Sequence, residues 1–247
     1  MIIDKRLLTA SGFVTRGGVA VDVGTDHAYL AVYLVKEGIS ERCIACDVAQ
    51  GPLAAAKKTV EENMLCDKID VVLSDGLDSV ISEGITDVIM CGMGGELIAD
   101  IIARAEFLKG DINIIAQPMT RADFFRKWLY ENGFEIVAEK ACSVDRFVYS
   151  VMNIRFCGEK RTVDDYFATV GKLDLSDSMS KAYVKEKAQR MITAANGMIK
   201  SLDKRQSLLL VAIGNGREHG TVVLQVHSRC LKCLIERSVI LIIVAYR

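Results

Sequence analysis

Short apolar runs alternate with amphipathic segments along the first half of the chain, and this alternation constrains the fold more than any other feature. Five runs have the length and β-branched content of buried strands, at residues 19–23, 43–47, 69–73, 86–91 and 112–116. Helical patterns occur at residues 4–13, 26–36, 51–63, 96–107 and 121–131. Strands that alternate with helices predict a largely parallel sheet that is covered on both faces.

Two further apolar runs, 134–138 and 148–154, follow each other too closely for a crossover helix, so we expect an antiparallel pair. Five βα units and a closing hairpin are typical of the α/β class I (Rossmann-like) methyltransferase sheet, whose last strand runs antiparallel. Ligands of open α/β sheets bind at the carboxyl ends of the strands. The polar clusters of this sequence follow strands, and they therefore predict one shared site.

The stretch from residue 19 to residue 30 joins the first strand to a helix that we expect to begin near Asp26 or His27. Such a turn exposes free backbone N–H groups and the positive end of a helix dipole. Gly24 lets a ligand approach the backbone, since it has no Cβ. Asp22 lies where a strand-end carboxylate can meet an amino group. An ordinary βα turn is the alternative, and this stretch alone does not separate the two.

Asp47 ends the second strand, roughly 20 residues after the glycine turn, where dinucleotide folds place a ribose-binding carboxylate. The fingerprint G-x-G-x-x-G is incomplete, because Asp26 stands where its second glycine belongs. A pyrophosphate would meet an extra negative charge at this position. The pattern therefore favours a ligand with a positive centre and no phosphate, such as S-adenosylmethionine, over NAD or FAD.

The eight cysteines are scattered, and several lie within apolar strands. Free thiols in a reducing cytosol explain this distribution better than a disulfide framework. The sequence has no apolar run of 18 residues and no signal-peptide pattern, so we expect a cytoplasmic protein that does not enter a membrane. Cys230 and Cys233, with His219 and His227 nearby, lack a second well-spaced pair, and no metal is expected.

Charge is distributed unevenly along the chain. Residues 1–180 carry 19 Lys+Arg and 28 Asp+Glu, whereas residues 181–247 carry 12 and 4. From residue 181 onward, apolar residues recur at alternating steps of four and three, which is a heptad seam. The members of this seam are Val184, Ala188, Met191, Ala195, Met198 and Leu202. A basic coiled-coil arm that contacts a polyanion and a plain solvated helix are both compatible with this pattern.

Two flanking regions are less regular. Residues 158–178 are polar and predict a linker or a short helix. Beyond residue 206 the seam is lost, and the apolar blocks 208–213 and 239–244 are more typical of strands than of heptads. Their packing is not predicted by the sequence.

Five motifs in this order resemble the bacterial tRNA (adenine-22-N1)-methyltransferase family, over residues 4–155. The motifs are Asp22–Leu30, Gly51-Pro52, Asp75-Gly76-Leu77, Gly92–Gly95 and Gln117-Pro118. The resemblance implies a methyltransferase domain at 1–157 and a C-terminal helical coiled-coil region at 158–247. It also implies S-adenosylmethionine as cofactor and tRNA as partner. We expect a monomer or weak dimer. Some members have Asn where Met119 stands, so the role of this position is open.

The resemblance also implies roles for individual residues. Adenine N1 can attack a sulfonium methyl without prior deprotonation, so positioning dominates. Asp26 is the first candidate for an electrostatic catalytic role and His27 the second, although His27 could serve only to orient the turn. The expected cofactor-binding residues are Asp22, Gly24, Asp26, Asp47, Val48, Asp75, Gly76, Gly92, Met93 and Gly94. The expected substrate-binding residues are Arg6, Tyr29, Gly95, Gln117, Pro118, Lys181, Lys185 and Arg190.

Two other classes of function stay open at this stage. One is a module that binds S-adenosylmethionine and RNA without turnover, because binding and turnover would use the same residues. The other is a nucleotide-dependent oxidoreductase, which Asp26 and the closing strand pair disfavour. A target adenine within a stacked region would have to be extruded to reach any such pocket.

Overall fold

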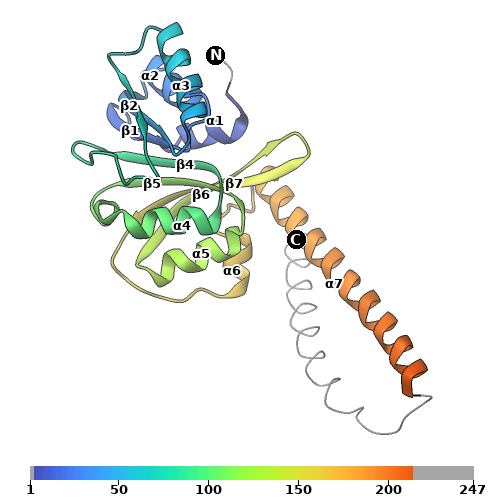
Figure 1. Cartoon of the computed structure of the whole chain (residues 1–247). Helices are drawn as coiled ribbons and strands as arrows, with labels where there is room; N and C mark the ends of the chain where they lie inside the picture. Colours follow the sequence, from blue (N-terminus) through green and yellow to red (C-terminus); the bar gives the residue numbers. More distant parts are fainter. Residues whose placement is uncertain (1–2, 214–247) are drawn as a thin grey trace. The chain divides into compact units, whose positions relative to one another are not determined.

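The computed structural model describes residues 3–213 of the 247-residue chain. The chain divides into two compact units, residues 1–180 and 181–247. The first unit is an α/β domain built on one seven-stranded sheet, and the second begins within a long helix (Figure 1).

The sheet has the strand order β3-β2-β1-β4-β5-β7-β6. Its strands are β1 (Gly18–Val23), β2 (Ser40–Asp47), β3 (Ile69–Leu73), β4 (Asp87–Gly94), β5 (Asn113–Thr120), β6 (Phe134–Val144) and β7 (Phe147–Phe156). Strands β1 to β5 pair in parallel, whereas β7 runs antiparallel to both β5 and β6. The predicted parallel sheet with an antiparallel closing pair is therefore confirmed.

Helices cover both faces of this sheet. They are α1 (Lys5–Ser11), α2 (Tyr29–Lys36), α3 (Gln50–Glu62), α4 (Gly95–Arg104), α5 (Ala122–Glu131) and α6 (Asp165–Val170), with a 3-10 turn at Glu106–Lys109. Side chains of α1, α2 and α3 form one buried cluster, and those of α4 and α5 form another. Ala20 and Val21 are neighbours in β1 but belong to opposite clusters, because successive side chains of a strand point to opposite faces.

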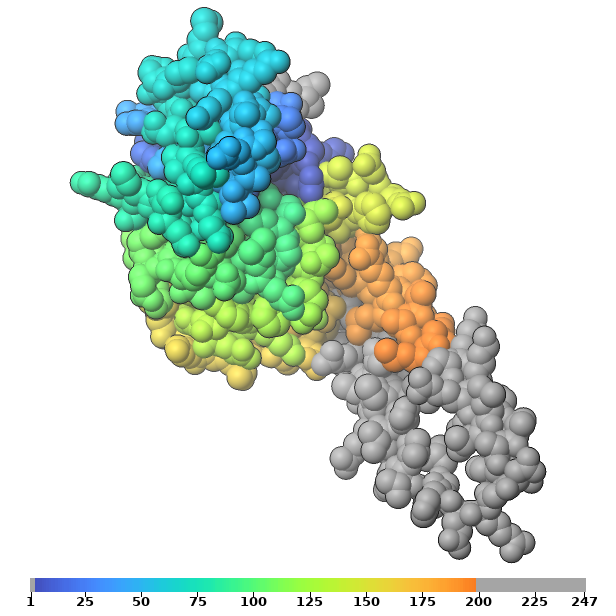
Figure 2. All heavy atoms as spheres, viewed as in Figure 1, coloured from blue at the N-terminus to red at the C-terminus, as the bar shows by residue number. Residues whose placement is uncertain are grey.

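Two expectations about the elements of the first unit are wrong. The chain does not contain five βα units, since the connection between β3 and β4, residues 74–86, consists of turns. Gly76 and Gly84 have positive φ there, which interrupts any helix. Helix α2 begins at Tyr29 instead of residue 26 or 27, because Ala28 is left-handed with φ 55°. The connection after β3 and the tip of the β6–β7 hairpin both project from the surface (Figure 2).

The segment after β7 packs on α5 and β6 through a buried ion pair. Arg126 of α5 binds the Glu139 carboxylate at 2.5 Å, and both side chains are fully buried. The same guanidinium donates to the carbonyl oxygen of Ala168 at 2.8 Å. Glu139 also accepts from the backbone N–H of Lys172 at 2.8 Å. The predicted linker or short helix is thus the helix α6, anchored to the sheet by these bonds.

The helix α7 (Ser178–Ile213) confirms the predicted basic helix. Val184, Ala188 and Ala195 of its seam are buried, while Met198 is exposed. Residues 208–213 are helical, so the strand expected there is wrong; a short apolar run cannot be assigned to strand or helix by periodicity alone. The coiled coil itself stays a prediction, and the block 239–244 lies outside the described residues. Within residues 3–213, no helix is long and apolar enough to cross a bilayer.

Candidate active site

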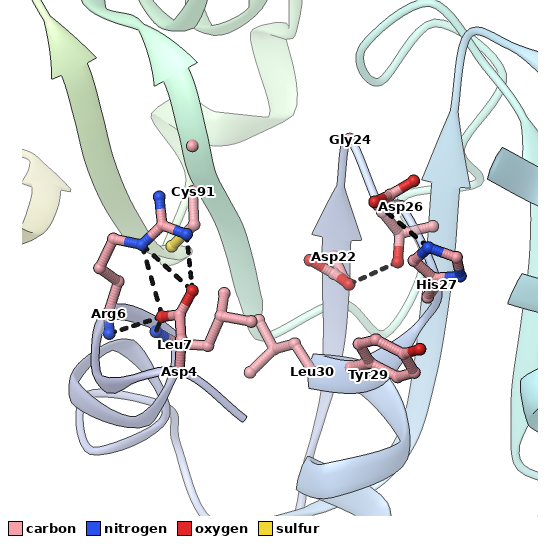
Figure 3. Close-up of a pocket in the computed structure, with 12 residues that line it drawn as sticks. Asp4, Arg6, Leu7, Asp22, Gly24, Asp26, His27, Tyr29, Leu30 and Cys91 are labelled. Atoms are coloured by element: carbon pink, nitrogen blue, oxygen red, sulfur yellow. Dashed lines mark hydrogen bonds and ion pairs between the residues drawn. The ribbon is translucent and has the colours of Figure 1, made fainter. Parts of the chain in front are cut away.

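A pocket of about 260 Å³ lies at the carboxyl ends of β1 and β4 (Figure 3). Three segments of chain supply its wall, namely the start of α1, the β1–α2 turn and the end of β4. The lining residues are Asp4, Arg6, Leu7, Asp22, Gly24, Thr25, Asp26, His27, Tyr29, Leu30, Cys91 and Gly92. The direction of chain crossover reverses between β1 and β4, which is where open α/β sheets bind their ligands.

Asp22 ends β1 and is buried at the base of this pocket. Its Oδ2 accepts a hydrogen bond of 2.8 Å from the Thr25 hydroxyl. Burial raises the pKa of Asp22 to about 6, the Thr25 bond opposes this increase, and the nearby charge of Asp47 adds to it. No cationic side chain of the described chain pairs with Asp22. The carboxylate is therefore suited to a positively charged group of a ligand.

The β1–α2 turn is held by bonds that the sequence did not predict. Thr25 donates its hydroxyl hydrogen to Asp22 and accepts from the backbone N–H of Ala28 at 3.0 Å. The N–H groups of Gly24 and Thr25 both donate to the carbonyl oxygen of Cys46, at 2.8 and 3.0 Å. The expectation of free N–H groups in this turn is thus wrong at these three positions, because the neighbouring strand and Thr25 use them.

Gly24 is favoured by its backbone conformation. Its φ is +74°, and a Cβ at this position would lie 2.3 Å from the Met93 methyl carbon. Met93 of β4 therefore closes over the β1 turn, which brings two of the predicted cofactor residues into contact. A larger residue at position 24 would be strained by the backbone, and the flexible end of Met93 would have to shift.

Asp26 and His27 lie at the mouth of the pocket. Their side chains are 80% and 42% exposed, and Asp26 Oδ2 is 3.4 Å from His27 Nε2. The His27 ring stacks on Tyr29 with 5.0 Å between centroids. Both candidate catalytic residues thus reach the same opening, and their catalytic roles stay predictions.

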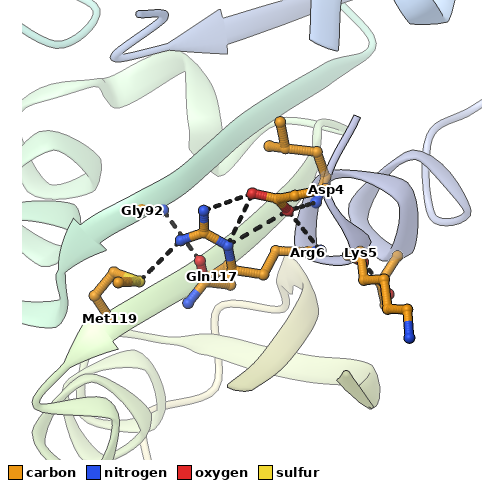
Figure 4. Close-up of polar contacts among 8 residues, drawn as sticks. Asp4, Lys5, Arg6, Gly92, Gln117 and Met119 are labelled. Atoms are coloured by element: carbon orange, nitrogen blue, oxygen red, sulfur yellow. Dashed lines mark hydrogen bonds and ion pairs between the residues drawn. The ribbon is translucent and has the colours of Figure 1, made fainter. Parts of the chain in front are cut away.

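Arg6 enters the pocket from the N-terminal helix. Asp4 caps this helix by accepting from the backbone N–H groups of Arg6 and Leu7, at 2.8 and 3.1 Å, and it binds the Arg6 guanidinium at 2.6 Å. Burial raises the pKa of Asp4, but the bonds from Arg6 and Leu7 outweigh it and the net pKa is lowered. Arg6 Nη1 also contacts the Met119 sulfur at 3.1 Å (Figure 4). No local pattern in the sequence indicated that Asp4 and Leu7 would reach the site.

Gln117 and Pro118, near the end of β5, lie beside the pocket. Both are buried, and Gln117 pairs with Cys91 in the β4–β5 register. The Gln117 Oε1 accepts from the backbone N–H of Gly92 at 3.2 Å. Pro118 pairs with Met93. Burial raises the pKa of the Cys91 thiol, which keeps it in its neutral form.

The predicted residues at the ends of β2 and β3 do not line this pocket. Asp47 accepts from the backbone N–H of Ala49 at 2.8 Å, and Val48 is exposed. Asp75 forms an ion pair with Arg104 of α4 at 3.1 Å. Gly76 is buried with φ +57°. Because β1, β2 and β3 are parallel neighbours, these residues extend the same edge of the sheet, and their cofactor roles stay predictions.

The remaining predicted site residues do not line the pocket. Gly94 caps α4. Gly95 is buried, and a Cβ there would lie 2.6 Å from the Arg121 carbonyl oxygen, so close packing accounts for this glycine. Lys181, Lys185 and Arg190 are exposed on α7, in the second unit.

The described residues contain no group of three or more His, Cys, Asp or Glu side chains that could hold a metal ion. The Cys230–Cys233 pair lies outside them. Burial raises the pKa of the Cys43 and Cys46 thiols to about 12, and both are free cysteines. These two thiols are therefore neutral, as expected for apolar packing in strands.

The sequence matches the family described as "Methyltransferase domain" over residues 3–152. It is 38% identical over 151 residues to the tRNA (adenine(22)-N(1))-methyltransferase of Bacillus subtilis. The matched residues make up 61% of this chain and 63% of that protein. The chain thus spans less than two thirds of that curated relative.

Solved structures are similar over more of the chain. A putative tRNA (m1A22) methyltransferase from Streptococcus pneumoniae, in complex with S-adenosyl-L-methionine, is 30% identical with a TM-score of 0.72. The similarity covers 85% of this chain and 99% of that one. A protein of the NADB-Rossmann superfamily from Streptococcus agalactiae is 31% identical with a TM-score of 0.73, covering 87% and 95%.

Proposed function

The chain belongs to the methyltransferase-domain family, and we propose that it methylates N1 of an adenine in tRNA with S-adenosylmethionine as the methyl donor. By likeness to the Bacillus subtilis and Streptococcus pneumoniae relatives, the target is adenine 22. The observation that carries the proposal is the Asp22 carboxylate, buried at the end of β1 without a cationic partner among the described residues. An amine complements this charge, whereas a phosphate would be repelled.

The residues at the sheet edge fit this cofactor. Asp22 would bind its amino group, and Gly24 would allow close approach of the backbone. Asp47 and Val48 would hold the ribose, and the Asp75–Gly76 turn would contact the adenine edge. Gly92, Met93 and Gly94 would line the transfer site, next to the pocket wall at the end of β4. When bound, S-adenosylmethionine supplies a methyl group that is already electrophilic.

The acceptor makes small demands on the protein. Adenine N1 carries an in-plane lone pair, so no side chain has to remove a proton before the attack. The protein must hold the base in line with the methyl group and exclude competing orientations. The base becomes cationic on methylation, and a carboxylate at the mouth of the pocket stabilises that charge. Asp26 occupies this place, with His27 3.4 Å from it as an orienting partner or second candidate.

The tRNA would contact both units. Arg6, Tyr29, Gln117 and Pro118 are the proposed contacts around the target base, with Gly95 at the start of α4. Lys181, Lys185 and Arg190 of α7 are exposed cations suited to phosphates. We propose a cytoplasmic location, which fits a tRNA substrate and free thiols. We also propose that the protein is a monomer or weak dimer.

Methyl transfer from radiolabelled S-adenosylmethionine to unmodified tRNA tests the proposal. We expect incorporation that maps to N1 of adenine 22 and that disappears when this adenine is replaced by guanine. Cofactor binding without incorporation would instead identify a binding module without turnover. Incorporation that survives the replacement would assign a different target nucleotide.

A further inference from the structure

Gln117 has a buried hydrogen-bond donor that the protein does not use. The side chain is fully buried, and its Oε1 accepts from the backbone N–H of Gly92 at 3.2 Å. Its Nε2 has no hydrogen-bond partner in the part of the chain that the structure describes. Asn113, four residues earlier on β5, differs in this respect, because its Nδ2 donates to Phe13 and to Asp87 at 2.8 and 2.6 Å. Buried amides are normally satisfied in this way.

The free end of the Gln117 amide is defined by its neighbour. The backbone N–H of Gly92 is a donor, so the atom that faces it must be the carbonyl oxygen. Rotating the amide by 180° would place two donors against each other and would leave two buried groups unsatisfied. The unused group is therefore an N–H donor, and the bonded Oε1 retains a second lone pair.

This amide lies beside the pocket, close to Met119 and Arg6. Gln117 pairs with Cys91, which lines the pocket. Met119, two residues further on the same face of β5, is 41% exposed and contacts Arg6 Nη1 at 3.1 Å. Figure 4 shows the Arg6 guanidinium beside the Gln117 side chain, with the contact between Arg6 and Met119 as a dashed line. A thioether is a weak acceptor, so an entering base can displace the contact of Arg6 with Met119 while Arg6 keeps its bonds to Asp4.

We propose that Gln117 reads the target adenine. Its Nε2 donates to adenine N7, and the second lone pair of Oε1 accepts from the adenine N6 amino group. A side-chain amide and adenine form this two-bond pair wherever geometry allows. The pairing uses N6 and N7, and it leaves N1 free to face the pocket. Guanine would present its O6 acceptor to Oε1 and would be rejected. This inference rests on the proposed methyl transfer and assigns its base specificity.

A functional-group exchange on both partners tests the pairing. The substrate is unmodified tRNA carrying either adenosine or 7-deazaadenosine at position 22, which removes the N7 acceptor and keeps N1 and N6. The protein is the full chain as wild type or Gln117→Glu, whose ionised carboxylate keeps an oxygen for Gly92 and removes the donor. We expect kcat/KM to fall about tenfold for either change alone. With both changes it should fall no further than with one.

The matched control is Met119→Leu, on the same strand without a polar group. It should keep the tenfold preference for adenosine over 7-deazaadenosine. Calorimetry should give an unchanged dissociation constant of S-adenosylmethionine for Gln117→Glu. If this variant does not fold, Gln117→Met replaces it, and the wild-type comparison of the two tRNAs tests the pairing without any variant.

Three results would overturn the pairing. The first is an equal rate of the wild type on the two tRNAs. The second is a loss of about a hundredfold when both changes are combined. The third is weaker S-adenosylmethionine binding by Gln117→Glu, because the amide would then contact the cofactor instead of the base. A wild type that transfers no methyl group to ordinary tRNA would instead reject the proposed function itself.

Discussion

At the scale of single residues, Asp22 carries a cost in stability that a ligand can offset. Its pKa in the folded protein is about 6, above the ordinary value of 3.8, chiefly because it is buried. The folded protein therefore binds this proton more tightly than the unfolded chain does. Ionised Asp22 destabilises the fold above about pH 6, and this destabilisation disappears as the pH falls toward 4.

Replacing Asp22 by Asn should separate stability from binding. At pH 7 we expect Asp22→Asn to be more stable than the wild type, on the order of 2 kcal/mol, because a buried charge is removed. The difference should vanish near pH 4, and S-adenosylmethionine binding should weaken strongly at pH 7. Urea denaturation at both pH values measures the stability, and calorimetry at pH 7 measures the binding of S-adenosylmethionine. A variant that is less stable at pH 7 would contradict this account of the carboxylate.

Asp26 differs from Asp22 because its side chain is 80% exposed at the mouth of the pocket. Asp26→Asn should lower kcat by about tenfold or more, since each factor of ten corresponds to about 1.4 kcal/mol of transition-state stabilisation. The dissociation constant of S-adenosylmethionine should change much less. Single-turnover kinetics and calorimetry measure the two quantities. Equal losses in both would make Asp26 a cofactor ligand.

At the scale of elements, a buried ion pair helps to hold the segment after β7 against the rest of the first unit. Arg126 and Glu139 join α5, β6 and the residues around α6, and neither carboxylate nor guanidinium reaches solvent. Removal of one partner leaves the other charge buried and unpaired. Loss of either partner alone should therefore destabilise this part of the fold.

Glu139→Gln should therefore lower the free energy of unfolding by about 3–5 kcal/mol. Arg161→Gln is the matched control, because its ion pair with Glu135, at 3.3 Å, is exposed on both sides. The control should lose no more than about 1 kcal/mol. Urea titrations of the full chain, followed by the single tryptophan, compare the two. Similar midpoints for both variants would show that the buried pair contributes little.

At the scale of the whole molecule, the two units carry opposite charge. Residues 1–180 are acidic, and residues 181–247 carry 12 Lys+Arg against 4 Asp+Glu. The pocket of the first unit contains the acids Asp4, Asp22 and Asp26 and one arginine, Arg6, which pairs with Asp4. If the proposed tRNA substrate is correct, the exposed cations of α7 should supply most of its phosphate contacts.

Replacing the four cations Lys181, Lys185, Lys187 and Arg190 by Gln should weaken tRNA binding at low salt. Each lost phosphate contact should flatten the log–log salt slope by about 0.7–0.9. Binding of S-adenosylmethionine should be unchanged.

The control for this variant has the same charge change in the first unit, at Lys36, Lys57, Lys58 and Lys68. Circular dichroism must show that α7 of the test variant remains helical. A salt slope equal to that of the wild type would identify α7 as a solvated helix that does not contact RNA.

The sequence by itself determined the seven strands of the first unit, most of the helices and the edge of the sheet at which the pocket lies. These follow from local periodicity, because a buried strand or an amphipathic helix imprints its own period on the residues that form it. The antiparallel closing pair followed from the short connection between the last two apolar runs, which leaves no room for a crossover helix. Asp22, Gly24, Asp26 and His27 could be placed in one site because they belong to a single turn.

Only the tertiary structure decided what surrounds these residues. Asp4 and Arg6 reach the pocket because α1 folds back toward the end of β4, and no periodicity within residues 4–13 encodes this contact. The unused donor of Gln117 exists because Gly92, 25 positions earlier, occupies only its oxygen. The pKa of Asp22 depends on burial by neighbours that are distant in sequence. Contacts between remote segments set these properties, and a local pattern carries no record of them.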